Sequence, residues 1–376
     1  MIPSFQPDLL IIAANARSLI ANRGDLISSL TSAGRRVEAA VPEADYLEEV
    51  ESLGIPIHKV GLVRAGISPL ADLAFVRQIA GLVRRRCPKA VLAYGAKPIV
   101  FGLPGARLGG AKRCFAMVTG LGHVYTTENA RTRLVRLAMG ALYRVALRIA
   151  GRTFFQNPDD LRGFTEPGLV QPDRALLING SGVNLDRFPL RPLPSVDGTR
   201  FLFVGRLLFE KGLREFVEAC RIVEARHPGC EFVVVGGHDP SLPHAVAAEE
   251  LEAWRAEGTV RFVGSVKDVR SWLEWCSVLV LPSYREGTPR SVLEAMAIGR
   301  AIITTDAPGC RETVMDGVNG YLVPPRSVEP LAEAMLRLAR DSSLVVKFAN
   351  AGRRFAEDKY DVHKVNAVIL QAMELA

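Results

Sequence analysis

The sequence predicts an α/β protein with two doubly wound parallel sheets, each in its own domain. The chain has 376 residues, which exceeds the about 250 to 300 residues at which a single hydrophobic core stops growing. Short apolar segments alternate with helical ones, a pattern typical of parallel strands joined by helices. This alternation stops at a stretch with several prolines and then starts again. We therefore expect two domains of the same kind.

In the first half, apolar runs mark the strands and longer mixed segments mark the helices. A helix expected at 24–33 ends at Gly34, because glycine readily adopts the left-handed conformation found after helices. Strands are expected at 9–14, 37–41, 113–118, 153–157 and 176–178. The stretch 187–198 contains three prolines and interrupts the pattern, so we interpret it as the linker between the domains.

The same alternation returns after this stretch. Strands are expected at 201–204, 232–235, 260–263, 278–281 and 301–304, with helices at 213–226, at 291–298 and from 328 onward. We therefore place an N-terminal domain at 1–190 and a C-terminal domain at 191–357, and expect the helix at 358–376 to pack back on the first domain. Ligands of such folds bind beyond the carboxyl ends of the strands, where we expect the functional site.

The composition is that of a folded protein. Hydrophobic residues make up 48% and charged residues 23%, which excludes a mainly disordered chain. No apolar run reaches the length of a membrane span, and the first one, 9–14, follows Asp8 rather than a basic segment, so we expect neither a spanning helix nor a secretory signal. The six cysteines form no CxxC pair, so we predict buried, reduced thiols in a cytoplasmic protein and no zinc or redox site.

The charges are divided unequally along the chain. Residues 1–192 contain 25 Lys and Arg against 15 Asp and Glu, whereas the rest contains 22 against 25, so the net charges are +10 and −3. This asymmetry indicates that the first half meets an anionic partner, such as a membrane surface or nucleic acid.

Residues 284–297, YREGTPRSVLEAMA, join a loop after a buried strand to the start of a helix. Gly287 allows a ligand to approach the backbone, Pro289 suits a helix start, and the unpaired N–H groups there attract anions. Glu286 and Glu294 would lie about 12 Å apart on a continuous helix, whereas a hydrolytic pair of carboxylates lies about 5 to 9.5 Å apart. The spacing therefore disfavours a glycosidase. It also fits two solvated glutamates near a helix start.

Residues 201–216, FLFVGRLLFEKGLREF, place Arg206 and Lys211 around the turn between a strand and a helix. Two cations at the carboxyl end of a strand can clamp a diphosphate, although such side chains are often only solvated. The sequence has no Walker A motif, no DxD motif and no complete GxGxxG. ATP hydrolysis, a metal-bound sugar diphosphate and nicotinamide chemistry therefore lack support.

Taken together, these segments resemble the retaining family-4 glycosyltransferases, which have the GT-B fold. The resemblance rests on GRLLFEKGLREF, on VVVGG at 233–237, on GVNLDRF at 182–188, and on 282–325, where an E-x7-E pattern is followed by DGxNGxLVxP. It covers nearly the whole chain and is most specific in the second half. The resemblance implies two Rossmann-like domains facing a central cleft. Within the family, the sequence looks most similar to bacterial enzymes that glycosylate polyprenyl-diphosphate-linked saccharides.

The resemblance also implies residue roles. Arg206 and Lys211 should hold the diphosphate of a nucleotide-sugar and stabilise the charge on the departing nucleotide, which makes them catalytic residues together with Glu286. Glu286 should contact the donor sugar and Glu294 the ribose. The other expected donor-binding residues are Gly287, Thr288, Pro289 and Arg290, through their backbone, and Val266, against the base. No metal or other cofactor is implied, and UDP is the nucleotide that the resemblance favours.

The first half departs from the family pattern at its start. Where many members have paired glycines after the first strand, this chain has AANARS at 13–18, so Asn15 or Ala16 would have to make the donor contact there. His123, within FAMVTGLGHVYT at 115–126, stands where some members have an active-site histidine. If His123 has no such role, it is an ordinary loop histidine.

Segment 131–149 predicts a basic amphipathic helix. Four arginines, Arg133, Arg136, Arg144 and Arg148, fall within about a third of the turn, opposite Leu134, Val135, Ala138, Leu142, Val145 and Ile149. This pattern fits a helix packed on its sheet with the arginines outward, and it also fits a helix docked on an anionic membrane. Nucleic acid is disfavoured, because the region lacks an aromatic platform and a recognition motif.

The sequence therefore predicts a retaining glycosyltransferase that moves a hexose or N-acetylhexosamine from a UDP-sugar to a polyprenyl-diphosphate-linked sugar. We expect it to act in cell-surface polysaccharide or glycoprotein glycan assembly, as a peripheral protein on the cytoplasmic face of the inner membrane. The alternatives are another GT-B enzyme, such as a UDP-N-acetylglucosamine 2-epimerase or a phosphorylase, and a non-catalytic binder of nucleotide-sugars or polyanions. An epimerase needs no acceptor, a pyridoxal phosphorylase needs a cofactor lysine and a longer chain, and a binder has no turnover.

Overall fold

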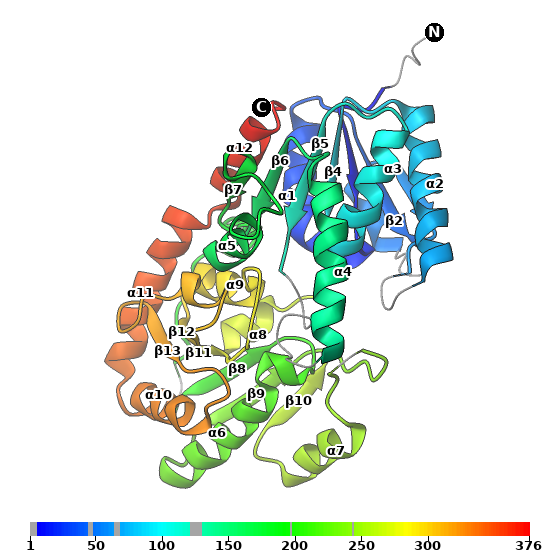
Figure 1. The fold of residues 1–376 in the computed structure, drawn as a ribbon. Coiled ribbons are helices and arrows are strands. Elements are labelled where there is room, and N and C mark those ends of the chain that lie inside the picture. Colours follow the sequence, from blue (N-terminus) through cyan, green and yellow to red (C-terminus); the bar gives the residue numbers. More distant parts are fainter. Residues whose placement is uncertain (1–5, 44–47, 64–67, 121–129, 196–197, 243) are drawn as a thin grey trace. The chain divides into compact units, whose positions relative to one another are not determined.

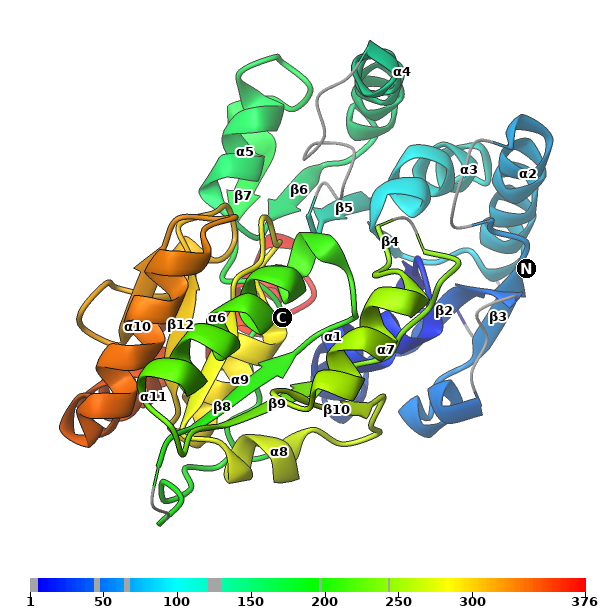
Figure 2. The same cartoon turned by 90° about the horizontal axis from the view of Figure 1, so that it is seen from below.

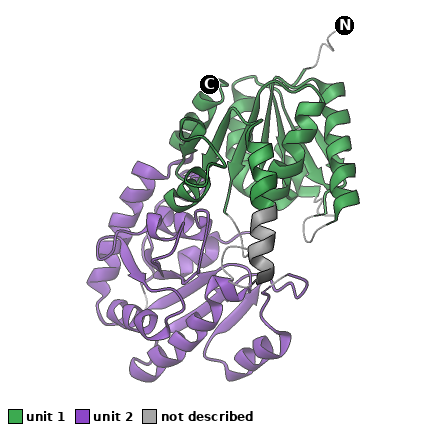
Figure 3. Ribbon diagram, viewed as in Figure 1, with its two compact units in different colours: residues 1–181, 363–376 green, residues 182–362 purple. Residues whose placement is uncertain are grey.

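The computed structural model divides into two compact units, residues 1–181 with 363–376 and residues 182–362 (Figures 1 and 3). We refer to them as unit 1 and unit 2 and describe each separately. The structure describes residues 6–43, 48–63, 68–120, 130–195, 198–242 and 244–376, and only the backbone of 130–138. The chain passes between the units before the proline-containing stretch 187–198, and again at 362–363. These boundaries differ from the expected ones, and the stretch interpreted as a linker belongs to unit 2.

Unit 1 is built on a parallel sheet that, within the described residues, has seven strands in the order β3-β2-β1-β4-β5-β6-β7. The strands are β1 (Leu9–Ile12), β2 (Val37–Pro42), β3 (Ile57–Val60), β4 (Ala90–Tyr94), β5 (Cys114–Val118), β6 (Arg152–Phe155) and β7 (Ala175–Leu177). The helices are α1 (Ala16–Ser32), α2 (Pro69–Arg86), α3 (Leu103–Leu108), α4 (Ala130–Leu147) and α5 (Pro158–Thr165). Short helical turns lie at η2 (Glu48–Leu53), η3 (Pro98–Gly102) and η5 (Pro172–Arg174).

Both faces of this sheet are covered, because alternate strand residues point to opposite sides. Leu10 and Ile12 belong to a core with residues of α2, α3, α4 and α5, whereas Leu9 and Ile11 belong to a second core with residues of α1 and the C-terminal helix α12 (Val362–Ala372). The helices α2, α3 and α4 lie side by side on one face (Figure 2).

Helix α12 completes the second core of unit 1 although it follows unit 2 in the chain. Its Val365 and Ile369, and the following Met373, are buried in that core. Arg113 Nη2 donates to the Met373 carbonyl at 2.6 Å and to Glu374 Oε2 at 2.8 Å. The end of the chain is therefore tied to unit 1 by apolar packing and by polar contacts.

Helix α1 starts earlier than predicted. The Asn15 side chain accepts a hydrogen bond from the Ser18 N–H at 2.6 Å and caps the helix. The predicted start at Gly24 is wrong, because Gly24 lies within the helix. The predicted end is right to within a residue, since the helix stops before Gly34, which has a φ of 74°.

The side of helix α4 that packs on unit 1 differs from the side predicted from its pattern of apolar and basic residues. Its buried side chains in the described part are Tyr143, Ala146 and Leu147. The expectation that Leu142 and Val145 lie on its packed side is wrong, because they are 40% and 59% exposed. The edge-on contact between the rings of Tyr143 and Phe164, at 5.0 Å, fixes the helix in this rotation. Arg144 and Arg148 are exposed, and the side chains of Arg133 and Arg136 lie outside the described residues.

The described residues of unit 2 form a six-stranded parallel sheet in the order β10-β9-β8-β11-β12-β13. The strands are β8 (Arg200–Val204), β9 (Glu231–Val235), β10 (Arg261–Gly264), β11 (Val278–Leu281), β12 (Ala301–Thr305) and β13 (Gly320–Val323). The helices are α6 (Leu213–Arg226), α7 (Ala248–Glu257), α8 (Arg270–Trp275), α9 (Arg290–Ile298), α10 (Val328–Arg340) and α11 (Ser342–Lys359), with short turns η6 (Phe209–Lys211) and η7 (Arg311–Thr313). The prediction of two doubly wound parallel sheets is confirmed.

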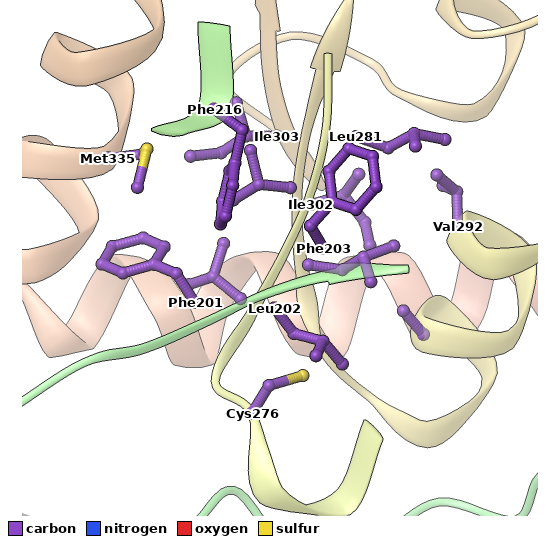
Figure 4. Packing of buried hydrophobic residues seen from close by; sticks show 14 of the residues in the cluster. Phe201, Leu202, Phe203, Phe216, Cys276, Leu281, Val292, Ile302, Ile303 and Met335 are labelled. Atoms are coloured by element: carbon purple, nitrogen blue, oxygen red, sulfur yellow. The ribbon is translucent and has the colours of Figure 1, made fainter. Parts of the chain in front are cut away.

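The core of unit 2 gathers aromatic and branched side chains from the central strands and the helices that cover them (Figure 4). The rings of Phe203 on β8 and Phe216 on α6 lie 5.6 Å apart. Helix α9 contributes almost its whole surface, since Val292 and Leu293 are fully buried. The elements that carry the site described below are therefore held by continuous apolar packing.

A buried arginine attaches the proline-containing stretch to unit 2. Arg300 is fully buried and donates to the carbonyls of Arg191 and Pro192, each at 3.0 Å, and to that of Leu273 at 2.7 Å. These carbonyl acceptors satisfy a guanidinium that would otherwise be costly to bury. Arg191 and Pro192 are therefore held against the rest of unit 2.

The described helices include none with both the length and the apolar character needed to cross a membrane. All six cysteines are free thiols, and Cys87 is exposed whereas the other five are buried. The prediction of buried thiols is therefore wrong for Cys87, which caps the end of α2 outside the core. Burial raises the pKa of the Cys276 thiol to about 12.

A buried carboxylate on β2 joins three elements of unit 1. Glu38 is 3% exposed, its Oε2 lies 2.8 Å from His58 Nε2, and Arg86 Nε donates to its two oxygens at 3.0 and 3.1 Å. Desolvation raises the pKa of Glu38, but hydrogen bonds from Arg86 and His58 outweigh it, and the pKa is lowered. The ionised carboxylate therefore stabilises the fold above the pH at which an unfolded glutamate titrates, and this stabilisation is lost as the pH falls.

We predict that Glu38→Gln lowers the free energy of unfolding of unit 1 by about 2 to 3 kcal/mol at pH 7, because Arg86 loses its charged partner. The difference from the wild type should begin to shrink as the pH falls below the usual glutamate pKa of about 4.3, and should disappear only when the folded carboxyl, whose pKa is lower, is protonated as well. Denaturant unfolding followed by circular dichroism over a series from neutral pH down to about pH 3 measures both effects. Glu252→Gln, which removes an exposed carboxylate, should change the stability by less than about 0.5 kcal/mol. A difference that stays constant with pH would contradict the prediction.

Candidate functional site

The strand order of unit 2 reverses between β8 and β11, which lie next to each other in the sheet. The chain leaves β8 toward β9 and leaves β11 toward β12, so the two connections diverge. Open α/β sheets bind ligands at such a point, beyond the carboxyl ends of the strands. The loop after β8 carries Arg206 and Lys211, and the loop after β11 carries Glu286.

The structure brings Lys211 and Glu286 together across this reversal. Lys211 Nζ donates to Glu286 Oε1, and the two side chains are 18% and 13% exposed. Residues 75 positions apart in the chain thus form a partly buried ion pair at the predicted edge of the sheet. Each side chain fixes the position of the other, and both remain accessible to a ligand.

Arg206 lies directly after β8 and is exposed. Its backbone carbonyl accepts a hydrogen bond from the Leu208 N–H at 2.8 Å, which holds the turn that precedes η6. The loop after β8 therefore supplies two cations, one in an ion pair and one open to solvent. Such a pair suits an anionic ligand with two charged groups, such as a diphosphate.

Two glycines allow the loops of this site to pack backbone against backbone. Gly212 has a φ of 72°, and a Cβ there would lie 2.1 Å from the Pro282 carbonyl oxygen. Gly309 has a φ of 81°, and a Cβ there would lie 2.2 Å from the Glu286 carbonyl oxygen. A hydrogen bond from the Glu286 N–H to the Pro308 carbonyl, at 2.9 Å, joins the same two loops. The position of Glu286 therefore depends on residues of three separate loops.

Helix α9 begins directly after the loop that carries Glu286. Pro289 is its N-cap, and Thr288 Oγ1 donates to the Gly287 carbonyl at 3.0 Å. Arg290, the first helical residue, donates to Oε1 of Glu294 from Nη2 at 2.6 Å and from Nε at 3.2 Å. The Val292 and Leu293 N–H groups both donate to the Pro289 carbonyl, at 3.1 and 3.3 Å. The start of a helix is in general a place where anions or hydroxyls can bind.

The other predicted site residues that the structure describes belong to other elements. Val266 follows β10 and packs against the core of unit 2 while remaining partly exposed. Asn15 caps α1 in unit 1 and Ala16 is the buried first residue of that helix. His123 lies outside the described residues. The described residues contain no group of three or more His, Cys, Asp and Glu side chains that could hold a metal ion.

A second layer of residues beneath the site is not evident from the sequence. Tyr284 donates from its hydroxyl to Glu215 Oε1 at 2.5 Å, and the guanidinium of Arg326 lies 4.8 Å from the centre of the Tyr284 ring. Desolvation, followed by the contact with Glu215, raises the pKa of Tyr284. Arg326 has a φ of 60°, which is uncommon for a residue other than glycine. Only the position of Tyr284 beside the E-x7-E pattern is a local signal, because its partners lie on α6 and after β13.

Two family models match the chain. The glycosyl transferase 4-like domain matches residues 23–180, and the model described as glycosyl transferases group 1 matches residues 198–341. A similar curated protein is the N,N'-diacetylbacillosaminyl-diphospho-undecaprenol alpha-1,3-N-acetylgalactosaminyltransferase of Campylobacter jejuni. It is 27% identical over 339 residues, which are 87% of this chain and 88% of that protein.

Solved structures share the fold over almost the whole chain. Sucrose-phosphate synthase from Thermosynechococcus elongatus has a TM-score of 0.81 at 20% identity and covers 98% of both chains. Alr3699/HepE of Anabaena, solved in complex with UDP and glucose, has a TM-score of 0.78 at 17% identity and covers 98% of this chain and 100% of that one. At these identities the comparison shows the fold alone.

We predict that Gly309→Ala lowers the free energy of unfolding of unit 2 by at least about 3 kcal/mol, because the new methyl group collides with the Glu286 carbonyl at a φ unfavourable for alanine. Gly317→Ala is the matched control. Gly317 has a similar φ of 71° but nothing within 4 Å of the new methyl group, so the expected loss is about 1 to 2 kcal/mol. Thermal and denaturant unfolding measure both variants. Equal losses would show that the contact with Glu286 is unimportant.

Proposed function

The chain belongs to glycosyltransferase family 4, whose members are retaining enzymes of the GT-B fold. On this basis we propose that it transfers a hexose or N-acetylhexosamine from a UDP-sugar to a polyprenyl-diphosphate-linked sugar. The observation that carries the proposal is the Lys211–Glu286 pair at the strand reversal of unit 2. The Campylobacter relative, which is named for a diphospho-undecaprenol acceptor, supports the acceptor class. The UDP complex of the Anabaena protein supports the nucleotide. Unit 2 then binds the donor and unit 1 the acceptor.

In this proposal the donor diphosphate lies between the cations of the β8 loop and the start of α9. Arg206 and Lys211 balance the charge that grows on the departing UDP as the bond between the sugar and the diphosphate breaks. The backbone from Gly287 to Arg290 adds N–H donors to sugar or phosphate oxygens. These fixed groups stabilise the leaving group without a metal ion, and no cofactor is required.

Glu286 orients the donor sugar. Its Oε1 accepts from Lys211, so the carboxylate is held at the sheet edge and can accept hydrogen bonds from sugar hydroxyls. Transfer with retention then proceeds on one face of the sugar, with a donor phosphate oxygen taking the proton of the acceptor hydroxyl. Glu294 accepts hydrogen bonds from the ribose, and Val266 packs on the base. His123, Asn15 and Ala16 contact the donor or the acceptor from unit 1.

We also propose that unit 1 docks on the anionic cytoplasmic face of the inner membrane, where a polyprenyl-linked acceptor resides. Arg144 on α4 and Arg148 directly after it are exposed, and so are the apolar side chains of Leu142 and Val145 on other sides of the helix. Basic residues near an anionic leaflet each contribute about 1 kcal/mol of attraction, and exposed apolar side chains can enter the interfacial region. By the helical periodicity of the sequence, we include Arg133 and Arg136 in the proposed docking surface.

The leading alternative is another GT-B enzyme that acts on a nucleotide-sugar without an acceptor, such as a 2-epimerase. The similarity to the Campylobacter transferase over 87% of the chain favours transfer. Acceptor dependence separates the two functions, because an epimerase needs no second substrate. A non-catalytic binder would show no turnover at all.

We predict that the purified protein releases UDP from one UDP-sugar only when a polyprenyl-diphosphate saccharide in detergent is present. Glu286→Gln should lower this release by about 100-fold or more, because the neutral amide no longer pairs with Lys211 or accepts from the sugar as a charged group. A coupled UDP assay over a panel of nucleotide-sugars measures both, with Glu252→Gln as a control that should match the wild type. Release without an acceptor would favour hydrolysis or epimerisation, and no release from any donor would reject the proposal.

We predict that Arg144→Glu combined with Arg148→Glu weakens binding to vesicles containing anionic lipid by at least about 30-fold, since two attractions of about 1 kcal/mol each are lost. Vesicle sedimentation measures the effect, and neutral vesicles should bind both proteins weakly. Arg221→Glu with Arg255→Glu makes the same charge change on unit 2 and should leave vesicle binding close to that of the wild type. Unchanged binding of the α4 variant would remove the docking proposal.

A further inference from the structure

Helix α9 has one polar side, and it is confined to the beginning of the helix. Six of its nine residues are buried and apolar: Val292, Leu293, Ala295, Met296, Ala297 and Ile298. The remaining three, Arg290, Ser291 and Glu294, share one side of the first turn and a half. A helix buried in the core thus places a charged pair at the sheet edge where the site lies.

The position of Arg290 is electrostatically unfavourable for the helix. A cation at the first helical residue lies at the positive end of the helix dipole, and an arginine followed by a glutamate four residues later is the less favourable order of such a pair. Local stability therefore does not account for this residue. Departures from local preference tend to occur at functional sites.

Glu294 needs the partner that Arg290 provides. Its side chain is 11% exposed, and a carboxylate so far removed from water requires compensating hydrogen bonds. Two hydrogen bonds from Arg290 end on the same oxygen of Glu294, Oε1. The two-pronged contact fixes the rotation of the carboxylate and leaves Oε2 as its second acceptor.

We propose that Arg290 is a positioning residue that orients Glu294 for recognition of the vicinal ribose hydroxyls of the donor nucleotide. The inference rests on the proposed function, which assigns Glu294 to the ribose. Arg290 acts through Glu294: with Oε1 occupied by the guanidinium, Oε2 accepts from the diol. The specificity for a ribonucleotide over a deoxynucleotide therefore depends on the pair rather than on Glu294 alone.

The test compares the binding of UDP and 2′,3′-dideoxy-UDP by calorimetry. The wild type should prefer UDP by about 10- to 100-fold, the range expected for hydrogen bonds to a charged acceptor. Glu294→Gln should reduce this preference to below about fivefold, and Arg290→Gln should do nearly the same although it leaves the carboxylate in place. Combining both substitutions should cause little further loss, because the residues act as a unit. Arg255→Gln, which removes an exposed arginine of α7, should retain the full preference.

Two results would overturn the inference. If Arg290→Gln weakens UDP and the dideoxy analogue by the same factor, the guanidinium contacts the diphosphate directly. If neither affinity changes, the pair only supports the helix. Arg290→Lys keeps a cation and one donor group, so we expect an intermediate preference for UDP. If Arg290→Gln unfolds, the lysine variant decides the question. A full preference for UDP in the lysine variant would then count against the inference.

The same measurement separates this inference from the proposed function. A wild type that binds UDP without any preference over the analogue would retain UDP as a ligand and reject the positioning role. A wild type that binds neither compound would reject UDP as the donor nucleotide, and the inference would fall with it.

Discussion

The site depends on the reversal of strand order in the sheet of unit 2. Because the connections after β8 and β11 leave in opposite directions, two loops that are distant in sequence begin side by side and then diverge. An ion pair between Lys211 and Glu286 joins these two loops. The glycine contacts at Gly212 and Gly309 bring the supporting loops within backbone distance. The chemistry assigned to the site thus follows from topology first and from side chains second.

Much of this fold can be predicted from apolar runs and helix periodicity. The strand at 278–281 and the helix at 213–226 have the predicted bounds, because VLVL is fully buried and α6 has one clear apolar face. The predictions omit β3, β4 and β13. Strand β3 is half exposed, and β13 lies in a glycine- and proline-rich segment that predicts a loop. The start of α1 depends on the Asn15 cap, a single hydrogen bond that apolar periodicity does not indicate.

The site is predictable to the extent that its residues share local motifs. Arg206, Lys211, Glu286 and Glu294 stand out because two short segments carry them at recognisable spacings. Their pairing does not follow from those spacings, since the contact between Lys211 and Glu286 arises only when the sheet forms. The rotation of α4 is similar, because the contact of its Tyr143 ring rather than its polarity decides which side packs. Non-local contacts of this kind leave no signal in a single sequence.

The placement of α12 has a consequence for how the protein is made. The sheet of unit 1 is encoded in the first 181 residues, yet one of its faces is covered by a helix that follows unit 2. During synthesis, therefore, the apolar patch that receives Val365 and Ile369 emerges from the ribosome uncovered. It stays exposed until unit 2 and then α12 have been synthesised. Exposed apolar surface of this sort makes a nascent chain prone to aggregation. Completion of unit 1 is thus a late event that requires all of unit 2 to have been translated, and chaperones that shield this face would act in that interval.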